Sequence, residues 1–246
     1  MTRTTPVSEG SDSRVIGARE LMRFHVQALF TFDEAGRLVA VNVRGGAVAP
    51  RFFLGCTAEG NVWWFRHDLG PALIDDLTTL CEQRSATLDR AAEPAHAVPF
   101  ITRLSRDDPI RGTWMGPAFR FPSDLPGHPT AIRVTSENAS VLSPYLEDWR
   151  DDVSGSAPMA VVLEAGKAVS VCCSVRITTH AHEAGVETHP DFRGRGHAAR
   201  AVSGWARAVR EMNRIPLYST SWTNEPSRAL ARKIGLIQYG ADLHIT

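Results

Sequence analysis

The chain lacks an excess of charge of either sign and lacks a long apolar run. Its 246 residues include 27 Lys and Arg against 27 Asp and Glu, so its formal net charge is zero. A dedicated nucleic-acid-binding protein usually carries a basic excess, so this balance argues against nucleic acid as a partner. No apolar stretch approaches the roughly 20 residues that a membrane-spanning helix needs. We therefore expect a partner that is neither nucleic acid nor a membrane.

Cysteine is scarce, and its spacing fits neither a metal site nor a disulfide framework. The four cysteines are Cys56, Cys81, Cys172 and Cys173. Neighbouring residues of a strand point to opposite faces, so Cys172 and Cys173 are poorly placed to bridge. The polar residues 1–6 also lack the apolar core of a signal peptide. Cysteines that stay reduced and serve only in packing, together with a start that lacks a signal peptide, predict a cytoplasmic protein without a metal cofactor.

Proline and glycine divide the chain into a tail, two folded parts and a connection. A composition of 43% hydrophobic and 22% charged residues is that of a globular protein. Residues 1–13 are polar and predict a disordered tail. Residues 100–127 are interrupted by several prolines and glycines, which predicts a linker or a long ordered loop. The folded parts are then expected at residues 14–99 and 128–246.

Residues 14–99 are expected to form a small α/β unit. Leu21, Phe24 and Ala28 recur at the spacing of one helical face. Runs of apolar and aromatic residues separated by a short polar turn predict a β-hairpin further on. The expected elements are a helix over 15–30, a strand over Leu38–Val41, strands over 51–56 and 61–66, and a helix over 71–84.

Residues 128–246 alternate between strand-like and helix-like patterns. Val202, Trp205 and Val209 recur with helical spacing, whereas Pro144 should kink or split an earlier helical stretch. The expected elements are a strand over 130–134, a helix over 137–151, a hairpin of 159–163 with 168–175, a strand over 179–188, a helix from about His197, a strand over 217–221, a short helix over 224–235 and a last strand over Ile237–Ile245.

The most informative segment is the turn between the strand at 179–188 and the helix at His197. The alternating run ends at Pro190, and a turn rich in Arg and Gly precedes the helix. Bare N–H groups at a helix start attract an anion, and Gly194 and Gly196 let a phosphate approach the backbone. The turn lacks the Gly-Lys-Ser/Thr ending of a P-loop and the three spaced glycines of a Rossmann turn.

A second segment downstream has the features of a short capped helix. Asn224 is a favourable N-cap, Pro226 is tolerated in the first turn, and Lys233 suits the last turn. Gly235 suits the position that follows the helix. The glycine turn and this segment are separated by one helix and one strand.

Together the two segments resemble the GNAT superfamily of N-acetyltransferases. Residues 193–198 match the Arg/Gln-x-x-Gly-x-Gly/Ala pattern of the family's acyl-CoA pyrophosphate loop. The downstream segment is similar to the family's second signature, with Asn224, Ser227, Leu230, Lys233, Gly235 and Leu236 in register. The resemblance covers about residues 128–246 and implies an α/β (α+β) fold with a mixed central sheet flanked by helices.

The resemblance implies acetyl-CoA as the acyl donor and an amine as the acceptor. Backbone N–H groups of the glycine turn would hold the pyrophosphate. The family separates two parallel strands beside the pantetheine arm, where a strand N–H would polarise the thioester carbonyl. The residues expected at the cofactor are Val186, Glu187, Thr188, Arg193, Gly194, Arg195, Gly196, His197, Ala198, Asn224 and Ser227.

A general base is needed because an ammonium has no lone pair with which to attack. By its register from Arg193, His182 falls where some relatives place a glutamate or histidine, and Glu183 on the other strand face is the second choice. In the alternative interpretation, His180 and His182 are only polar residues of a solvent-facing strand. A metal site at His180 and His182 is less favoured, because the sequence shows no third ligand for it.

The leaving thiolate needs a proton, and the usual donor is absent. Many relatives place a tyrosine directly after the signature leucine, whereas this chain has Ala231 there. Tyr218, Tyr239 or water could replace it, or the thiolate could leave unprotonated. The missing tyrosine keeps a second hypothesis open, a non-catalytic acyl-CoA-binding or sensing domain.

The leading hypothesis is an N-acetyltransferase for a small-molecule amine, with a peptide amine less favoured. An RNA-binding role for the Arg-Gly run has little support at zero net charge. The sequence names neither the acceptor nor the acyl chain length, and it leaves monomer and homodimer open. The family usually pairs one more strand with the last one, so the segment 14–99 is expected to cover the free edge of Ile237–Ile245.

Overall fold

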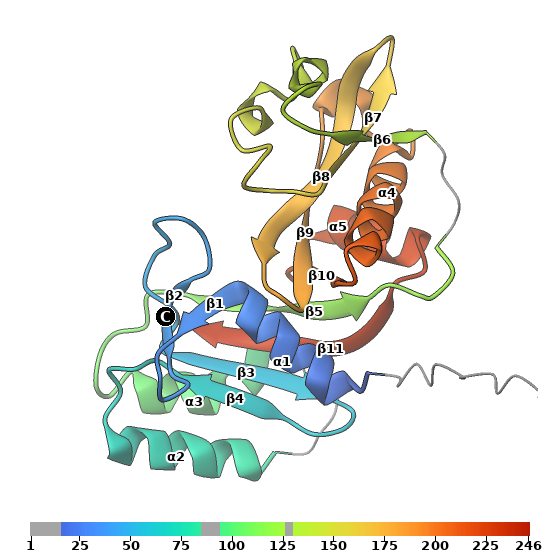
Figure 1. The fold of residues 1–246 in the computed structure, drawn as a ribbon. Helices are drawn as coiled ribbons and strands as arrows, with labels where there is room; N and C mark the ends of the chain where they lie inside the picture. Colours follow the sequence, from blue (N-terminus) through green and yellow to red (C-terminus); the bar gives the residue numbers. More distant parts are fainter. Residues whose placement is uncertain (1–15, 85–93, 126–129) are drawn as a thin grey trace, which may run out of the picture.

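A single large mixed sheet organises the protein. The computed structural model describes residues 16–84, 94–125 and 130–246. In these residues nine strands form one sheet in the order β4-β3-β11-β5-β10-β9-β8-β7-β6, and a two-stranded ribbon, β1-β2, lies beside it (Figure 1). Helices flank the sheet on both faces, which confirms the expected α+β class. The tail predicted at residues 1–13 lies outside the described residues.

The C-terminal half begins with an antiparallel meander. Its four strands are β6 (Ala131–Val134), β7 (Met159–Glu164), β8 (Lys167–Ile177) and β9 (Ala181–Thr188). The helix α4 (His197–Glu211) then returns the chain to β10 (Ile215–Ser219), which pairs in parallel with β9. The predicted hairpin and the predicted helix start at His197 are confirmed.

The segment 100–127 is not a linker, and the prediction of one is wrong for its described part. It contains the helix α3 (Val98–Leu104) and the strand β5 (Thr113–Arg120), which lies between β10 and β11 (Ile237–Ile245). A Cβ on Gly116 would lie 1.8 Å from the carbonyl oxygen of Thr220, so only glycine fits there. The glycine that suggested a break is therefore a requirement of a buried strand.

The remaining edge of β11 is covered by the N-terminal part of the chain, as expected. The strand β3 (Phe52–Thr57) pairs antiparallel with β11 from Phe52↔Ile245 to Thr57↔Gly240, and β4 (Val62–Phe65) pairs with β3. These two strands are continuous with the C-terminal sheet. The last strand therefore has a neighbour on each side.

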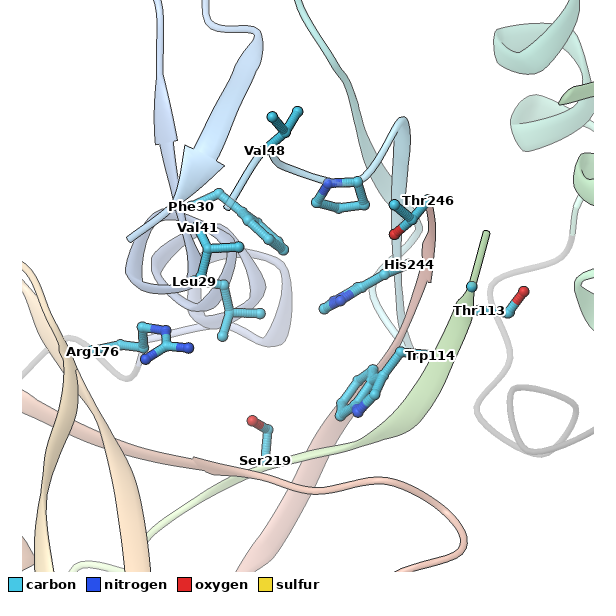
Figure 2. A pocket seen from close by; sticks show the side chains of 12 residues that line it. Leu29, Phe30, Val41, Val48, Thr113, Trp114, Arg176, Ser219, His244 and Thr246 are labelled. Carbon is cyan, nitrogen blue, oxygen red and sulfur yellow. The ribbon is translucent and has the colours of Figure 1, made fainter. Parts of the chain in front are cut away.

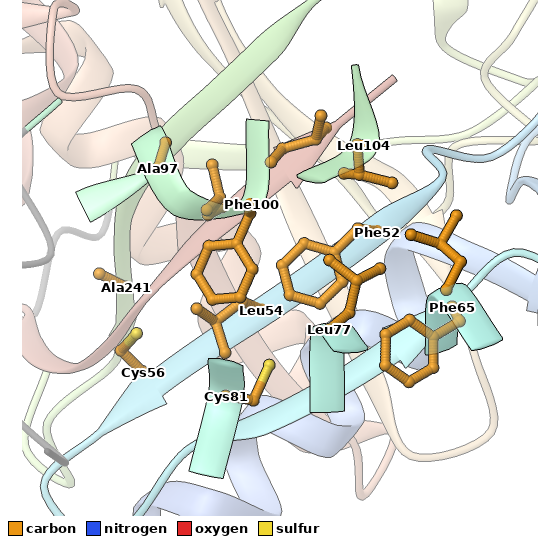
Figure 3. Packing of buried hydrophobic residues seen from close by; sticks show 13 residues of the cluster. Phe52, Leu54, Cys56, Phe65, Leu77, Cys81, Ala97, Phe100, Leu104 and Ala241 are labelled. Atoms are coloured by element: carbon orange, nitrogen blue, oxygen red, sulfur yellow. The ribbon is translucent and has the colours of Figure 1, made fainter. Parts of the chain in front are cut away.

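The helices divide between the two faces of the sheet. On β5, Met115 and Phe119 share one face, which packs against α2 (Pro71–Glu82) and α3 at one end and against α4 at the other. Phe52 and Phe100 stack there at 4.8 Å between ring centres (Figure 3). The last helix, α5 (Glu225–Lys233), also contributes to this side.

The opposite face carries α1 (Ala18–Leu29) and the ribbon of β1 (Phe30–Phe32) and β2 (Leu38–Val41). Figure 1 shows α1 and α2 on opposite sides of β3 and β4. We call this second face the α1 face. It matters for function because the polar side chains described below point into it.

The helix predicted over residues 137–151 is absent. The structure has two 3-10 turns instead, Ala139–Leu142 and Glu147–Trp149. Pro144 lies between them, and proline offers no N–H and disfavours helical backbone at the residue before it. Leu142 and Leu146 from this segment are buried with Val161 and Val171 of the sheet. Burial rather than helical periodicity explains the apolar pattern.

Candidate active site

A cleft opens where the parallel strands β9 and β10 separate. Their pairing covers three positions, from Ile215↔Ala181 to Leu217↔Glu183, and β10 then pairs only with β5. Beyond Glu183, β9 continues to Thr188 with β8 on its other edge. Backbone groups on the free edge of this stretch therefore face the cleft and can bind a ligand.

The glycine turn lies at the open end of the cleft and leads directly into α4. Gly194 and Gly196 have φ values of 77° and 79°, a left-handed conformation that glycine adopts without strain. No side chain of the described residues caps α4, and the first hydrogen bond into the helix is from the N–H of Arg200 to the carbonyl of Gly196. The first-turn N–H groups and the helix dipole therefore favour an anion at this point.

The cleft has a cavity volume of about 540 Å³, and most of the residues predicted for the cofactor line it. Arg195 is the exception, because its guanidinium turns to the carboxylate of Glu164 at 3.3 Å and to the carbonyl of Asp191. The predicted residues that line the cleft are Val186, Glu187, Thr188, Arg193, Gly194, Gly196, His197, Ala198, Asn224 and Ser227.

Lys233 also lines the cleft, although the sequence placed it only in the second signature and the last turn of a helix, not at the cofactor. Its Nζ would lie 3.4 Å from a Cβ built on Gly196, so the ammonium stands over the glycine turn. Arg193 instead donates from Nε to the carbonyl of Thr188 at 3.1 Å. The cleft thus combines open backbone N–H groups with one lysine, a donor set that fits a pyrophosphate.

The second signature forms the far wall of the cleft. Asn224 caps α5, since its side-chain oxygen accepts from the N–H of Ser227 at 3.1 Å. The Ser227 hydroxyl lies 2.6 Å from the hydroxyl of Tyr218. Burial raises the pKa of Tyr218 to about 12. Tyr218, predicted from the sequence as a replacement acid, therefore reaches the cleft through Ser227.

His182, the first choice for the base, lies on the face covered by α4. Its Nδ1 is 2.9 Å from the Ser174 hydroxyl, which also accepts from the indole N–H of Trp205. Burial, followed by the charge of Arg214, lowers the pKa of His182. His182 is 2% exposed and lines neither the cleft nor the cavity described below, so its surroundings are those of a packed core histidine.

Glu183 points the other way, into a buried polar network on the α1 face. His25 of α1 lies between two carboxylates, with Nδ1 2.5 Å from Oε1 of Glu183 and Nε2 3.5 Å from Oδ2 of Asp242. Asp242 in turn lies 2.5 Å from Nε2 of His244. The other carboxylate oxygen of Glu183 accepts from the Ser219 hydroxyl at 3.3 Å.

The network holds a proton on His25. Burial alone lowers the pKa of His25, but the charges and hydrogen bonds of Glu183 and Asp242 outweigh it and raise the pKa from 6.5 to about 10. Burial raises the pKa of Asp242, and the contacts with His244 and His25 reverse this, so its net pKa is lowered. Sequence patterns do not identify the partners in this network, because His25, Glu183 and Asp242 lie far apart in the chain.

Tyr239, the second replacement acid predicted from the sequence, lies on the α1 face and not in the cleft. Its hydroxyl is buried and has no hydrogen-bond partner among the described residues. Burial, and then the charges of Glu183 and Asp242, raise its pKa well above the ordinary value. The structure therefore separates the two tyrosines, with Tyr218 beside the cleft and Tyr239 beside the Glu183 network.

A second cavity, of about 490 Å³, opens on the α1 face. Ser219 and His244, which both belong to the Glu183 network, line it together with Arg176 and Trp114 (Figure 2). The apolar part of its wall comes from α1, the ribbon and the loop that follows the ribbon. The two cavities thus lie on opposite faces of the sheet, with the junction of β9 and β10 between them.

Two features are absent from the described residues. No helix among them is long and apolar enough to cross a membrane. They also contain no cluster of histidine, cysteine and carboxylate side chains suited to a metal ion.

Comparisons with known proteins point to one family. The sequence model of the family described as GNAT acetyltransferase matches residues 151–241, which include the hairpin of β7 and β8, the glycine turn, the cleft and most of β11. No curated protein sequence matches the chain.

Solved structures with a similar fold include a GCN5-related N-acetyltransferase from Kribbella flavida, with 16% identity, 95% of this chain and 96% of that chain covered, and a TM-score of 0.48. A GCN5-related N-acetyltransferase-like protein from Streptococcus suis has 14% identity and a TM-score of 0.45, and the match covers 94% of this chain and 100% of that chain. An acetyltransferase of the GNAT family from Novosphingobium aromaticivorans has 14% identity and a TM-score of 0.46. The match covers 55% of this chain and 65% of that chain, so this chain spans slightly less than two thirds of its length. By the family-model match, residues 151–241 form a GNAT acetyltransferase domain.

Proposed function

We propose that the protein is an N-acetyltransferase that moves an acetyl group from acetyl-CoA to the amine of a small molecule. The observation that carries this proposal is the cleft at the separation of β9 and β10, bordered by the uncapped start of α4. The family supplies acetyl transfer as the general activity. The donor, the amine and the small-molecule acceptor are our inferences from the two cavities.

Each wall of the cleft has a proposed part in holding the donor. The N–H groups of residues 194–198 and the ammonium of Lys233 bind the pyrophosphate. The free edge of β9 at residues 186–188 binds the pantetheine arm, and a strand N–H polarises the thioester carbonyl. The thioester supplies an acetyl group that an uncharged amine can attack.

Glu183 is the proposed base, in preference to His182. One of its oxygens is held by His25 at 2.5 Å, and the other faces Ser219, which lines the cavity on the α1 face. An amine in that cavity would pass its proton through the Ser219 hydroxyl, or through water, to Glu183. His182 lacks access to either cavity because Trp205 and Ser174 cover it.

Ser227 and Tyr218 are the proposed source of the proton for the thiolate. The amine nitrogen forms its bond to the acetyl carbon while the carbon–sulfur bond breaks, so the sulfur leaves with the electron pair. Ser227 lines the cleft on that side, and Tyr218 can replace the proton that Ser227 gives up. This pair takes the place of the tyrosine that many relatives carry at Ala231, which is fully buried here.

The test is release of free CoA from acetyl-CoA in the presence of a panel of amines. We expect Glu183→Gln to lower kcat about 100-fold, the usual size of a general-base contribution, and to leave acetyl-CoA affinity unchanged. Glu20→Gln, on the exposed surface of α1, is the matched control and should retain full activity. Loss of turnover in His182→Gln but not in Glu183→Gln would refute the assignment of the base.

The alternative, a domain that binds acyl-CoA without catalysis, rests on the alanine at position 231. It makes a different prediction in the same assay, because acetyl-CoA would bind saturably and no amine would be acetylated. Binding without turnover across chemically diverse amines would favour this alternative over the enzyme.

A further inference from the structure

The cavity on the α1 face has one strongly basic side chain. Arg176 lies at one end of β8, and its guanidinium points into the cavity, opposite Thr246 at the other end (Figure 2). Glu183 is its neighbour across the β8–β9 pair. The cation therefore stands beside the proposed base, where the amine of the acceptor would react.

Arg176 forms no ion pair in the part of the chain that the structure describes. Among the described residues, its guanidinium donates one hydrogen bond, from a terminal nitrogen to the carbonyl of Val175 at 2.7 Å, and its buried Nε has no partner. The charge of Glu183 acts on Arg176 and opposes the lowering of its pKa by burial, but the hydrogen bonds of the Glu183 carboxylate among the described residues are to His25 and Ser219. A partly buried guanidinium with unused donors has the geometry that binds a carboxylate through two parallel hydrogen bonds.

The rest of the cavity is mainly apolar and aromatic. Trp114 and the imidazole of His244 stack with 4.8 Å between their ring centres and 24° between their planes. Leu29, Phe30 and Val41 supply aliphatic and aromatic surface around them. A volume of about 490 Å³ leaves room for one small molecule with an apolar group.

We propose that the acetyl acceptor is an α-amino acid with an apolar or aromatic side chain. Its carboxylate binds Arg176, its amine lies at Ser219 within reach of Glu183, and its side chain extends along Trp114. In an α-amino acid the amine and the carboxylate lie close together, because they are attached to one carbon. Glu183 and Arg176 are also close together, because they are neighbours across the β8–β9 strand pair. This inference rests on the proposed acetyl transfer and adds the class of acceptor.

The test compares acceptors that differ only at the carboxylate. L-Phenylalanine and L-leucine are each assayed against the corresponding decarboxylated amine and amino-acid amide, with saturating acetyl-CoA and release of CoA as the readout. We expect kcat/KM of the wild-type protein to be at least about tenfold higher for the acids, since loss of a charged hydrogen-bond partner typically changes affinity by that much. This comparison needs no variant that might misfold.

Variants then assign the preference to Arg176. In Arg176→Met, we expect KM for the acids to rise about 10- to 100-fold and kcat/KM for the matched amines to change less than about threefold. Arg176→Lys should recover part of the preference, because it keeps the charge but not the paired donors. Arg133→Met, on the exposed edge strand β6, is the matched control and should behave as wild type.

Two results with the wild-type protein would overturn the inference while the proposed function stands. One is acetylation of the amines or amides as efficiently as the acids, and the other is acetylation of other small-molecule amines without acetylation of any amino acid. Equal loss of activity toward acids and amines in Arg176→Met would also contradict it, because an anchor for the carboxylate acts on the acids alone. Failure to bind acetyl-CoA would overturn the proposed function and this inference together.

Discussion

Replacing His25 by glutamine removes the cation between two buried carboxylates. His25 is fully buried, and Glu183 and Asp242 are each 2% exposed. Glutamine has a similar length, but it carries no charge and can donate to both carboxylates only through one amide group. The substitution therefore leaves two negative charges facing each other with almost no exposure to solvent, and the folded state should lose stability.

The size of the loss follows from the pKa of His25. A pKa of about 10 in the folded protein against 6.5 in the unfolded chain means that the folded state binds this proton far more tightly. At pH 7 the linkage amounts to about 4 kcal/mol of stability. Removal of one partner from a buried charge pair typically costs 3–5 kcal/mol, which is about the same magnitude.

The raised pKa of His25 also determines how the stability of the folded protein depends on pH. Because the pKa is raised on folding, the contribution is fully present below about pH 6.5 and is lost as the pH rises through about 10. Between pH 7 and pH 9, the wild-type protein should lose about 1.4 kcal/mol per pH unit from this group. His25→Gln should lack this slope.

The assay is urea unfolding of both proteins at pH 7, 8 and 9, followed by circular dichroism. His67→Gln, an exposed histidine at the end of β4, serves as the control and should match wild type throughout. The reasoning is refuted if His25→Gln lies within about 1 kcal/mol of wild type at pH 7, or if the two proteins lose stability in parallel from pH 7 to pH 9.

Three further predictions follow from single contacts. Gly116→Ala should destabilise the protein by at least about 2 kcal/mol in urea unfolding, because its Cβ would lie 1.8 Å from the Thr220 carbonyl oxygen; a loss below 0.5 kcal/mol would show that β5 and β10 are not in such close contact. Asn224→Ala should cost about 1 kcal/mol in the same experiment, since Ser227 N–H loses its cap, and an unchanged midpoint would argue against that cap. Tyr218→Phe should lower kcat about tenfold with acetyl-CoA affinity within twofold, and full activity would exclude Tyr218 from proton transfer.

The cleft beside the glycine turn could be predicted because its determinants are local in the sequence. The glycine turn between Val186 and Ala198 needs particular backbone angles and a helix start, and both leave a direct trace in residue type. The predicted last strand, Ile237–Ile245, agrees with the structure for a similar reason, since a run of strand-forming residues is bounded by Gly235.

The network around Glu183 could not be predicted because it depends on contacts across the fold. His25 lies on a helix more than 150 positions from Glu183, and Asp242 and His244 appear as isolated polar residues in an apolar strand. A polar side chain in an apolar element indicates a buried contact, but it does not identify the partner. Only the pairing of β11 with β5 and the position of α1 bring the four side chains together.

The strand β5 was missed for a different physical reason. Gly116 and Pro117 are residues that usually end a strand, and a sequence pattern cannot reveal that a neighbouring backbone requires the glycine. Pro117 is accommodated because its carbonyl still accepts a hydrogen bond from Thr220 N–H at 3.3 Å. The tendency of Gly116 and Pro117 to end a strand is therefore outweighed by the close packing of β5 against β10.

The most direct test of the account is calorimetric titration of acetyl-CoA into the wild-type protein and Gly196→Glu. A glutamate at position 196 would place a carboxylate beside Lys233 and in the proposed pyrophosphate site. Gly36→Glu is the matched control, because Gly36 has a φ of 73°, open space around its Cβ position and a place in the β1–β2 turn. The account predicts saturable binding to wild type and Gly36→Glu and none to Gly196→Glu. Absence of binding to the wild-type protein at millimolar acetyl-CoA, or equal binding to all three, would contradict the assignment of the cleft.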